Sequence, residues 1–192
     1  MKKISIIITL MFSFISLMAE GVYTYGKAID FQSGFVGSLW HPYMRLSQYD
    51  DNDGGVGVLN MLILYTKTSD DYQNYPPESR LLLKLSNDSI LELKSFGEVK
   101  KYYECISIGT KLQDVYHTGR DYTLPDKELD LLLTYPITKV RIELTNGNRL
   151  DYEISEKHGK KVLKQLKESY KNVLATQKKR LKNVNSDLKD DF

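Results

Sequence analysis

The sequence has few of the residue types that cross-link a small protein or interrupt its regular structure. Its 192 residues include one cysteine, one tryptophan, three histidines and five prolines. A single cysteine excludes an intrachain disulfide framework. A composition of 41% hydrophobic and 27% charged residues excludes a collagen and a compositionally disordered chain. A globular protein with a hydrophobic core of its own remains.

The longest apolar run lies at the N-terminus and has the layout of a secretory signal peptide. Two lysines at positions 2 and 3 precede the apolar stretch from Ile4 to Leu17, and Ala19 is a small residue at the cleavage edge. The stretch is too short for a stable membrane anchor, and no cysteine follows it for lipid attachment. We predict a signal peptide over residues 1–19 and a periplasmic or secreted protein; the alternative is a buried N-terminal helix or strand.

Removal of this signal would leave a neutral chain whose two parts have opposite charge. The 27 basic residues less two lysines give 25, which equals the number of acidic residues. Residues 20–155 hold 14 basic and 20 acidic residues, whereas residues 156–192 hold 11 and 5. The C-terminal segment therefore has an excess of six positive charges, opposite an equal negative excess.

Two segments with a period of two predict β-hairpins, over Arg80–Leu93 and Lys139–Tyr152. Their apolar residues lie on one side of the ribbon only if each loop holds an odd number of residues. In the second hairpin, a loop of Thr145, Asn146 and Gly147 meets this condition and places the glycine in the left-handed conformation. Further predictions are strands over 35–49, 56–65 and 102–108, strand and loop over 112–123, a loop over 66–79 and a short helix over 125–134.

After Ile154 the hydrophobic period changes to 3.6, which predicts a helix from an N-cap at Ser155 to about Asn183. Its length is about 40 Å at 1.5 Å per residue. The apolar stripe thins beyond Leu174, so we expect the last turns to overhang the domain. We place the single domain at residues 20–184 and a flexible tail at residues 185–192.

Nine lysines of this helix share one face, and several are spaced i,i+4, which destabilises an isolated helix. One interpretation is a solvated face whose charge is balanced by the acidic body. The other is a binding face for lipid headgroups, acidic glycans or an acidic partner. We name as the lysine face the five residues predicted to bind a partner: Lys160, Lys164, Lys167, Lys171 and Lys178.

No residue pattern indicates a catalytic centre. In the acidic turn at 50–55, an EF-hand register would place Met61 where calcium requires a glutamate. The histidines His41, His117 and His158 have no paired spacing. The chain has no phosphate-binding glycine loop, no Gly-x-Ser-x-Gly and no His-Glu-x-x-His. We therefore predict no catalytic residue, no cofactor and no metal ion.

Cys105 shares a strand face with Tyr103 and Ser107, and we expect a small buried core residue rather than a reactive thiol. His117 and Asp121 could serve such a thiol as base and orienting acid, but nothing in the sequence brings them to it.

Aromatic residues are frequent, with 14 tyrosines in addition to Trp40. Tyrosines on strands, such as Tyr43, are typical of half-buried cross-strand packing. The same residues could instead form a surface on which a glycan stacks.

The C-terminal half carries a short helix, then the sequence Pro-Ile-Thr-Lys-Val-Arg-Ile-Glu from Pro136 to Glu143, a hairpin, and a helix containing Gly159-Lys160-Lys161. Over about 60 of the 192 residues this pattern resembles a group of small exported proteins of Bacteroidetes. The resemblance implies export and an α+β domain, and it implies no active-site residue.

Together these features predict an α+β fold, a largely antiparallel sheet with a short helix and a long C-terminal amphipathic helix packed on one face. The predicted core contains Leu83, Leu91, Ile106, Ile142, Leu150, Leu166 and Tyr170.

The leading functional hypothesis is a non-enzymatic envelope protein that binds a protein, a glycan or an anionic surface, with no transmembrane segment after residue 19 and no specific nucleic-acid partner. One alternative is an envelope hydrolase or isomerase with loop-borne Asp50, Asp53 and His117. The other is a structural subunit that pairs through its helix or an edge strand.

Overall fold

The computed structural model describes residues 22–31, 42–50, 58–68, 72–73, 75–108, 110–144 and 147–190, without the side chains of residues 106, 108 and 181–190. The predicted signal peptide, Trp40, His41 and Asp53 lie outside this part of the chain.

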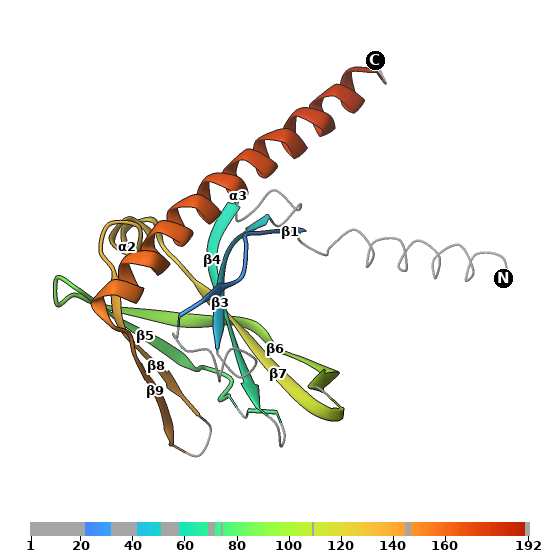
Figure 1. Ribbon diagram of the computed structural model, residues 1–192. Helices are drawn as coiled ribbons and strands as arrows, with labels where there is room; N and C mark the ends of the chain where they lie inside the picture. The colour runs from blue at the N-terminus through green and yellow to red at the C-terminus, as the bar shows by residue number, and fades with distance from the viewer. Residues whose placement is uncertain are drawn as a thin grey trace, which may run out of the picture.

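Nine strands of the described residues form one antiparallel sheet, which together with two helices gives the predicted α+β fold (Figure 1). The strand order is β1-β3-β4-β7-β6-β5-β8-β9, with β2 paired to β3. The strands are β1 Val22–Tyr25, β2 Ile29–Asp30, β3 Tyr43–Asp50, β4 Val58–Thr68, β5 Arg80–Leu85, β6 Ile90–Ile108, β7 Lys111–Thr123, β8 Ile137–Glu143 and β9 Arg149–Glu153. The helices are α2 Asp126–Leu132 and α3 Glu156–Asp190.

Strand β6 belongs to both halves of the sheet. Up to Lys94 it pairs with β5, and from Ser95 it pairs with β7. The register of the second pairing shifts between Phe96 and Lys100, where Gly97 has a φ of 65°. Such a bulge bends a strand and increases its twist. We call β1–β4, β7 and the later part of β6 the first half-sheet, and the early part of β6 with β5, β8 and β9 the second half-sheet.

One hydrophobic core joins the inner faces of the two half-sheets to the first turns of α3. Leu83, Leu91, Ile142 and Leu166 are buried in it, as predicted. Leu150 and Tyr170 pack against it half-buried, and the side chain of Ile106 lies outside the described part.

Helix α3 packs on the sheet through one stripe of its surface. Val162, Leu166, Ser169 and Val173 are buried at spacings of three and four residues, as an amphipathic helix requires. Gly159 allows a close approach, because a Cβ at this position would lie 2.6 Å from the carbonyl oxygen of Ile137 on β8.

Beyond Val173 the helix leaves the sheet, as Figure 1 shows, and none of the residues 174–180 is buried. The predicted overhang is therefore present. The predicted end at Asn183 is wrong, because α3 continues to Asp190. No glycine or proline stands between these positions to stop a helix.

Both predicted hairpins are confirmed. In the second, Leu144 N–H donates to the Asn148 carbonyl at 2.9 Å across a three-residue loop, and Gly147 has a φ of 76°. In the first, Leu85 bonds to Ser89 in the same way, and Asp88 takes the left-handed position with a φ of 64°.

Three strands are longer than predicted. Strand β6 joins the predicted hairpin strand that ends at Leu93 to the predicted strand over 102–108, β7 is continuous from Lys111 to Thr123, and β4 extends to Thr68. No helix of the described residues has the length and hydrophobicity to cross a membrane.

Candidate functional site

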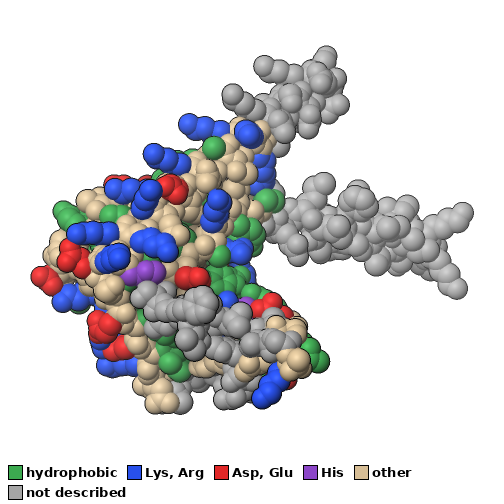
Figure 2. Space-filling model, in the orientation of Figure 1, with side chains coloured by type: hydrophobic (Ala, Val, Ile, Leu, Met, Phe, Trp, Pro, Cys, Tyr) green, Lys and Arg blue, Asp and Glu red, His purple; other side chains and the backbone are tan. Residues whose placement is uncertain are grey.

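The lysine face is exposed from Lys160 to Lys178. All five of its lysines are exposed, and Figure 2 shows Lys and Arg side chains gathered along this helix. Lys160 pairs with Glu156 one turn earlier at 2.5 Å. No other ion pair of these lysines occurs within the described residues. The acidic body therefore does not neutralise this face by direct contact there.

The face of the first half-sheet that lies opposite α3, on which Met61 and Ile63 are also buried, carries a second group of residues, which sequence reasoning did not assemble. Tyr43 and Tyr65 stack with their ring centroids 4.8 Å apart, and Tyr102 stacks on His117 at 4.0 Å. The hydroxyl groups of Tyr43 and Tyr102 lie 2.9 Å apart. We call this group the tyrosine layer; its rings are Tyr23, Tyr25, Tyr43, Tyr49, Tyr65, Phe96, Tyr102 and His117.

Strand register explains why these rings meet. Tyr43 lies opposite Tyr65, which lies opposite Gly119, and Tyr102 lies opposite His117. Residues directly opposite on an antiparallel sheet share a face. A Cβ on Gly119 would overlap the ring of Tyr65, so the absence of a side chain there gives this ring its place.

A buried carboxylate lies beneath the rings. Asp121 is 2% exposed and accepts hydrogen bonds from the Tyr23 hydroxyl at 2.8 Å and from Lys100 Nζ at 2.7 Å. Lys100 also lies 4.4 Å from the ring centroid of Tyr23. Burial and the bond to Asp121 raise the pKa of Tyr23, so its hydroxyl remains a hydrogen-bond donor.

His117 is the histidine of this face. It is 2% exposed, and its Nε2 lies 2.7 Å from Glu104 Oε1. Burial lowers the pKa of His117, and the neighbouring Glu104 opposes this only in part. The imidazole is therefore neutral at pH 7 and donates from Nε2 to the carboxylate. Its other nitrogen, Nδ1, is buried with no partner.

Three buried polar atoms of this face have no hydrogen-bond partner: Arg45 Nε, Ser47 Oγ and His117 Nδ1. Ser47 is 2% exposed. Buried polar groups in proteins are nearly always paired, and an unpaired one costs about 1–3 kcal/mol. This face thus retains unused hydrogen-bonding capacity.

Asp50 and His117, the two described residues of the hydrolase hypothesis, lie far apart on the sheet. Asp50 pairs with Val58, and His117 pairs with Lys67, nine residues farther along β4. This spacing corresponds to about 30 Å along a strand. Asp53 lies outside the described residues.

The expected burial of Cys105 is wrong, because this residue is exposed. Its register partner is Asp114, on the part of the β6–β7 ribbon beyond the last residue paired with β4. Alternation also places Cys105 on the opposite face from His117, which stacks on the ring of Tyr102. The nucleophile triad is therefore not formed.

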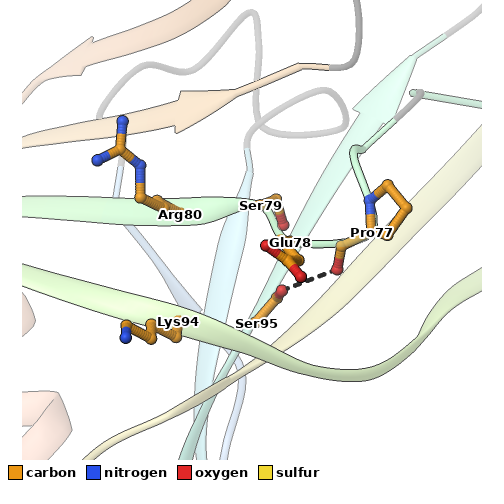
Figure 3. A pocket seen from close by; sticks show the side chains of 6 residues that line it. All are labelled: Pro77, Glu78, Ser79, Arg80, Lys94 and Ser95. Atoms are coloured by element: carbon orange, nitrogen blue, oxygen red, sulfur yellow. Dashed lines mark hydrogen bonds between the residues drawn. The ribbon is translucent and has the colours of Figure 1, made fainter.

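A groove of about 420 Å³ opens where β5 and β6 begin their pairing (Figure 3). Several of its polar groups are used within the protein. Ser95 Oγ donates to the Pro77 carbonyl at 3.0 Å, and Arg120 donates to the same oxygen. Arg80, at the other end of the groove, is paired with Glu92 and Glu143. Glu78 and Lys94, which also line the groove, are exposed and form no ion pair among the described residues.

Within the described ranges, no three His, Cys, Asp or Glu side chains are grouped so as to hold a metal ion. Comparisons of this chain with protein-family models, curated proteins and solved structures find no match.

Proposed function

We propose that this protein is an exported, non-enzymatic binding protein of the cell envelope, and that the lysine face of α3 recognises an anionic partner. The exposure of all five lysines along one helix carries this proposal. Export rests on the predicted signal peptide and on the resemblance to exported proteins.

Charge supports the proposal. Residues 156–180 hold nine basic and two acidic residues, a net charge of +7. Like charges this close repel one another, and a bound anion relieves that repulsion. A solvated face needs no such concentration of one sign.

Helix geometry supports it too. The stripe that anchors α3 ends at Val173, so Lys178 lies on the part of the helix that has left the sheet. A projecting, positively charged helix can approach an extended anionic surface without obstruction by the body (Figure 2).

Charge reversal tests the proposal directly. We expect the triple variant Lys164→Glu, Lys171→Glu and Lys178→Glu to bind vesicles containing phosphatidylglycerol about 100-fold more weakly than the wild type at low salt. The reason is that each lysine near an anionic surface contributes about 1 kcal/mol. Co-sedimentation at 20 and 200 mM salt measures both the affinity and its salt dependence.

A control with the same change of net charge separates site from bulk charge. Lys94, Lys111 and Lys127 are exposed lysines of the body, and their reversal should weaken binding only a few-fold. Equal losses of vesicle affinity in the two triple variants would show that binding depends on net charge alone and not on the lysine face. Absence of wild-type binding to vesicles and to an acidic polymer would refute the proposal.

A further inference from the structure

We propose that the tyrosine layer is a second binding site, and that its ligand is an acidic saccharide, a sugar chain that carries carboxylate groups. This inference is independent of the lysine face, since it rests on different residues on the sheet.

Aromatic rings supply the platform. Tyr25 is 50% exposed and Tyr102 is 41% exposed, the rings of Tyr23, Tyr49 and Tyr65 are half-buried, and Tyr43 is buried. Helix α3 packs against the opposite face of the same strands, together with Met44 and Leu46. The apolar faces of sugar rings pack on aromatic rings arranged in this way.

Unpaired polar atoms supply the hydrogen bonds. Arg45 Nε and His117 Nδ1 lie on either side of the Tyr43–Tyr65 stack, and Ser47 Oγ lies on the same face one register step beyond Arg45. Hydroxyl groups both donate and accept, so a saccharide can satisfy all three where an apolar ligand satisfies none. Reaching these buried atoms requires the half-exposed rings to shift as the ligand enters.

Charge selects an acidic sugar. Arg45 and Lys67 lie 5.9 and 5.2 Å from the ring centroid of Tyr43, and neither has a carboxylate partner among the described residues. By contrast, Lys100 is neutralised by Asp121. Glu104, which accepts from neutral His117, is the opposing charge on this face, so Arg45 and Lys67 leave a net positive charge beside the ring stack. That charge matches a uronic acid, whose carboxylate projects from a ring that can stack.

A single-stranded nucleic acid also combines stacking with negative charge. Its binding depends on a basic groove that follows many phosphates. Two unpaired cations are too few for that, so the saccharide is the better match.

Neighbouring residues of β6 provide a matched test, because alternation puts them on opposite faces. Tyr102 lies in the tyrosine layer and Tyr103, 49% exposed, lies on the other side of the sheet. We expect Tyr102→Leu to weaken binding of a galacturonic acid tetramer about tenfold by calorimetry, because it removes a stacking ring. Tyr103→Leu should bind within twofold of the wild type.

The charge contribution has an equivalent pair. Lys67→Gln should weaken binding of the tetramer severalfold, whereas Lys101→Gln, on the opposite face of β6, should leave it unchanged. The corresponding neutral galactose tetramer should bind the wild type more weakly than the acidic one.

Several outcomes would overturn the inference: no wild-type binding of the acidic tetramer, equal losses in Tyr102→Leu and Tyr103→Leu, or tighter binding of an oligonucleotide of similar length. If Tyr102→Leu does not fold, Tyr102→Phe, which keeps the ring, and Lys67→Gln decide the question. The triple reversal on α3 should leave tetramer binding intact, so failure of the vesicle experiment and failure of this one are distinguishable.

Discussion

The two half-sheets accommodate the charged groups on the faces opposite their common core in different ways. On the second half-sheet, charged residues of opposite sign pair across the strands. Arg80 bonds Glu143 at 2.8 Å, Arg141 bonds Asp151 at 2.7 Å, and Lys139 bonds Glu153 at 2.6 Å. On the first half-sheet, rings cover a buried Asp121.

The two faces differ in how completely their polar groups are satisfied. The ion pairs hold the pKa of Asp151 and Glu143 below the usual values of these carboxyl groups. None of the buried polar atoms without a partner lies on that face, among the residues that the structure describes. The face that carries the tyrosine layer holds three such atoms, on Arg45, Ser47 and His117. A face whose groups pair with one another suits a structural role, whereas a face with unpaired groups suits binding.

The largest expected effect comes from removing one cation on each face. Lys100→Met leaves Asp121, 2% exposed, with a tyrosine hydroxyl in place of a cation, and should cost about 2–3 kcal/mol of unfolding free energy. Arg80→Met removes the two ion pairs that the exposed Arg80 forms with Glu92 and Glu143, and should cost much less. Urea denaturation measures both. Equal losses would mean that Asp121 is not isolated from solvent.

A smaller effect follows from filling the space under a ring. Gly119→Ala forces the ring of Tyr65 away and should cost about 2 kcal/mol through the resulting strain. With Tyr65→Ala already in place, the added methyl group should cost little, so a double-mutant cycle isolates the contact. Additive losses in that cycle would show that the glycine serves the backbone and not the ring.

The smallest effect is on the pH dependence of stability. Because the folded-state pKa of His117 is below its ordinary value of 6.5, the unfolded chain takes up a proton first as the pH falls. Stability contributed by neutral His117 is complete above pH 6.5 and is lost toward the lower, folded-state pKa. The carboxyl groups of the second half-sheet keep their contribution to a lower pH, because their pKa values are lowered from 3.8 and 4.5.

Urea midpoints between pH 7.5 and 5 measure this dependence. His117→Gln should flatten the curve over that range, while Asp151→Asn should leave its shape there unchanged. A wild-type curve that is flat down to pH 5 would contradict the assignment of a neutral, buried imidazole.

Local pattern was enough to predict the hairpins and α3. Parity of the apolar residues fixes a hairpin loop when one face is buried, and it located Gly147 correctly. The 3.6-residue period likewise located the buried stripe through Leu166. The same reasoning failed for Cys105, because alternation shows which residues share a face and not whether anything covers that face.

The tyrosine layer could not be predicted, because its contacts join distant positions. Tyr23 reaches Asp121 across 98 residues, Lys100 reaches it across 21, and Tyr43 reaches Tyr102 across 59. Only the order of the strands brings these residues together. The alternation of His117, Gly119 and Asp121 along one strand was the signal available, and by itself it does not indicate which residues oppose it.

Strand β6 makes the unfolding of the two half-sheets cooperative. Its 19 residues supply a hydrogen-bonding edge to both half-sheets. Unfolding of either half-sheet would remove a hydrogen-bonded neighbour of the other and expose the common core. Neither half-sheet is therefore expected to stay folded alone. The two faces therefore unfold in one transition. A destabilising substitution in the tyrosine layer lowers the melting temperature of the charged face as well.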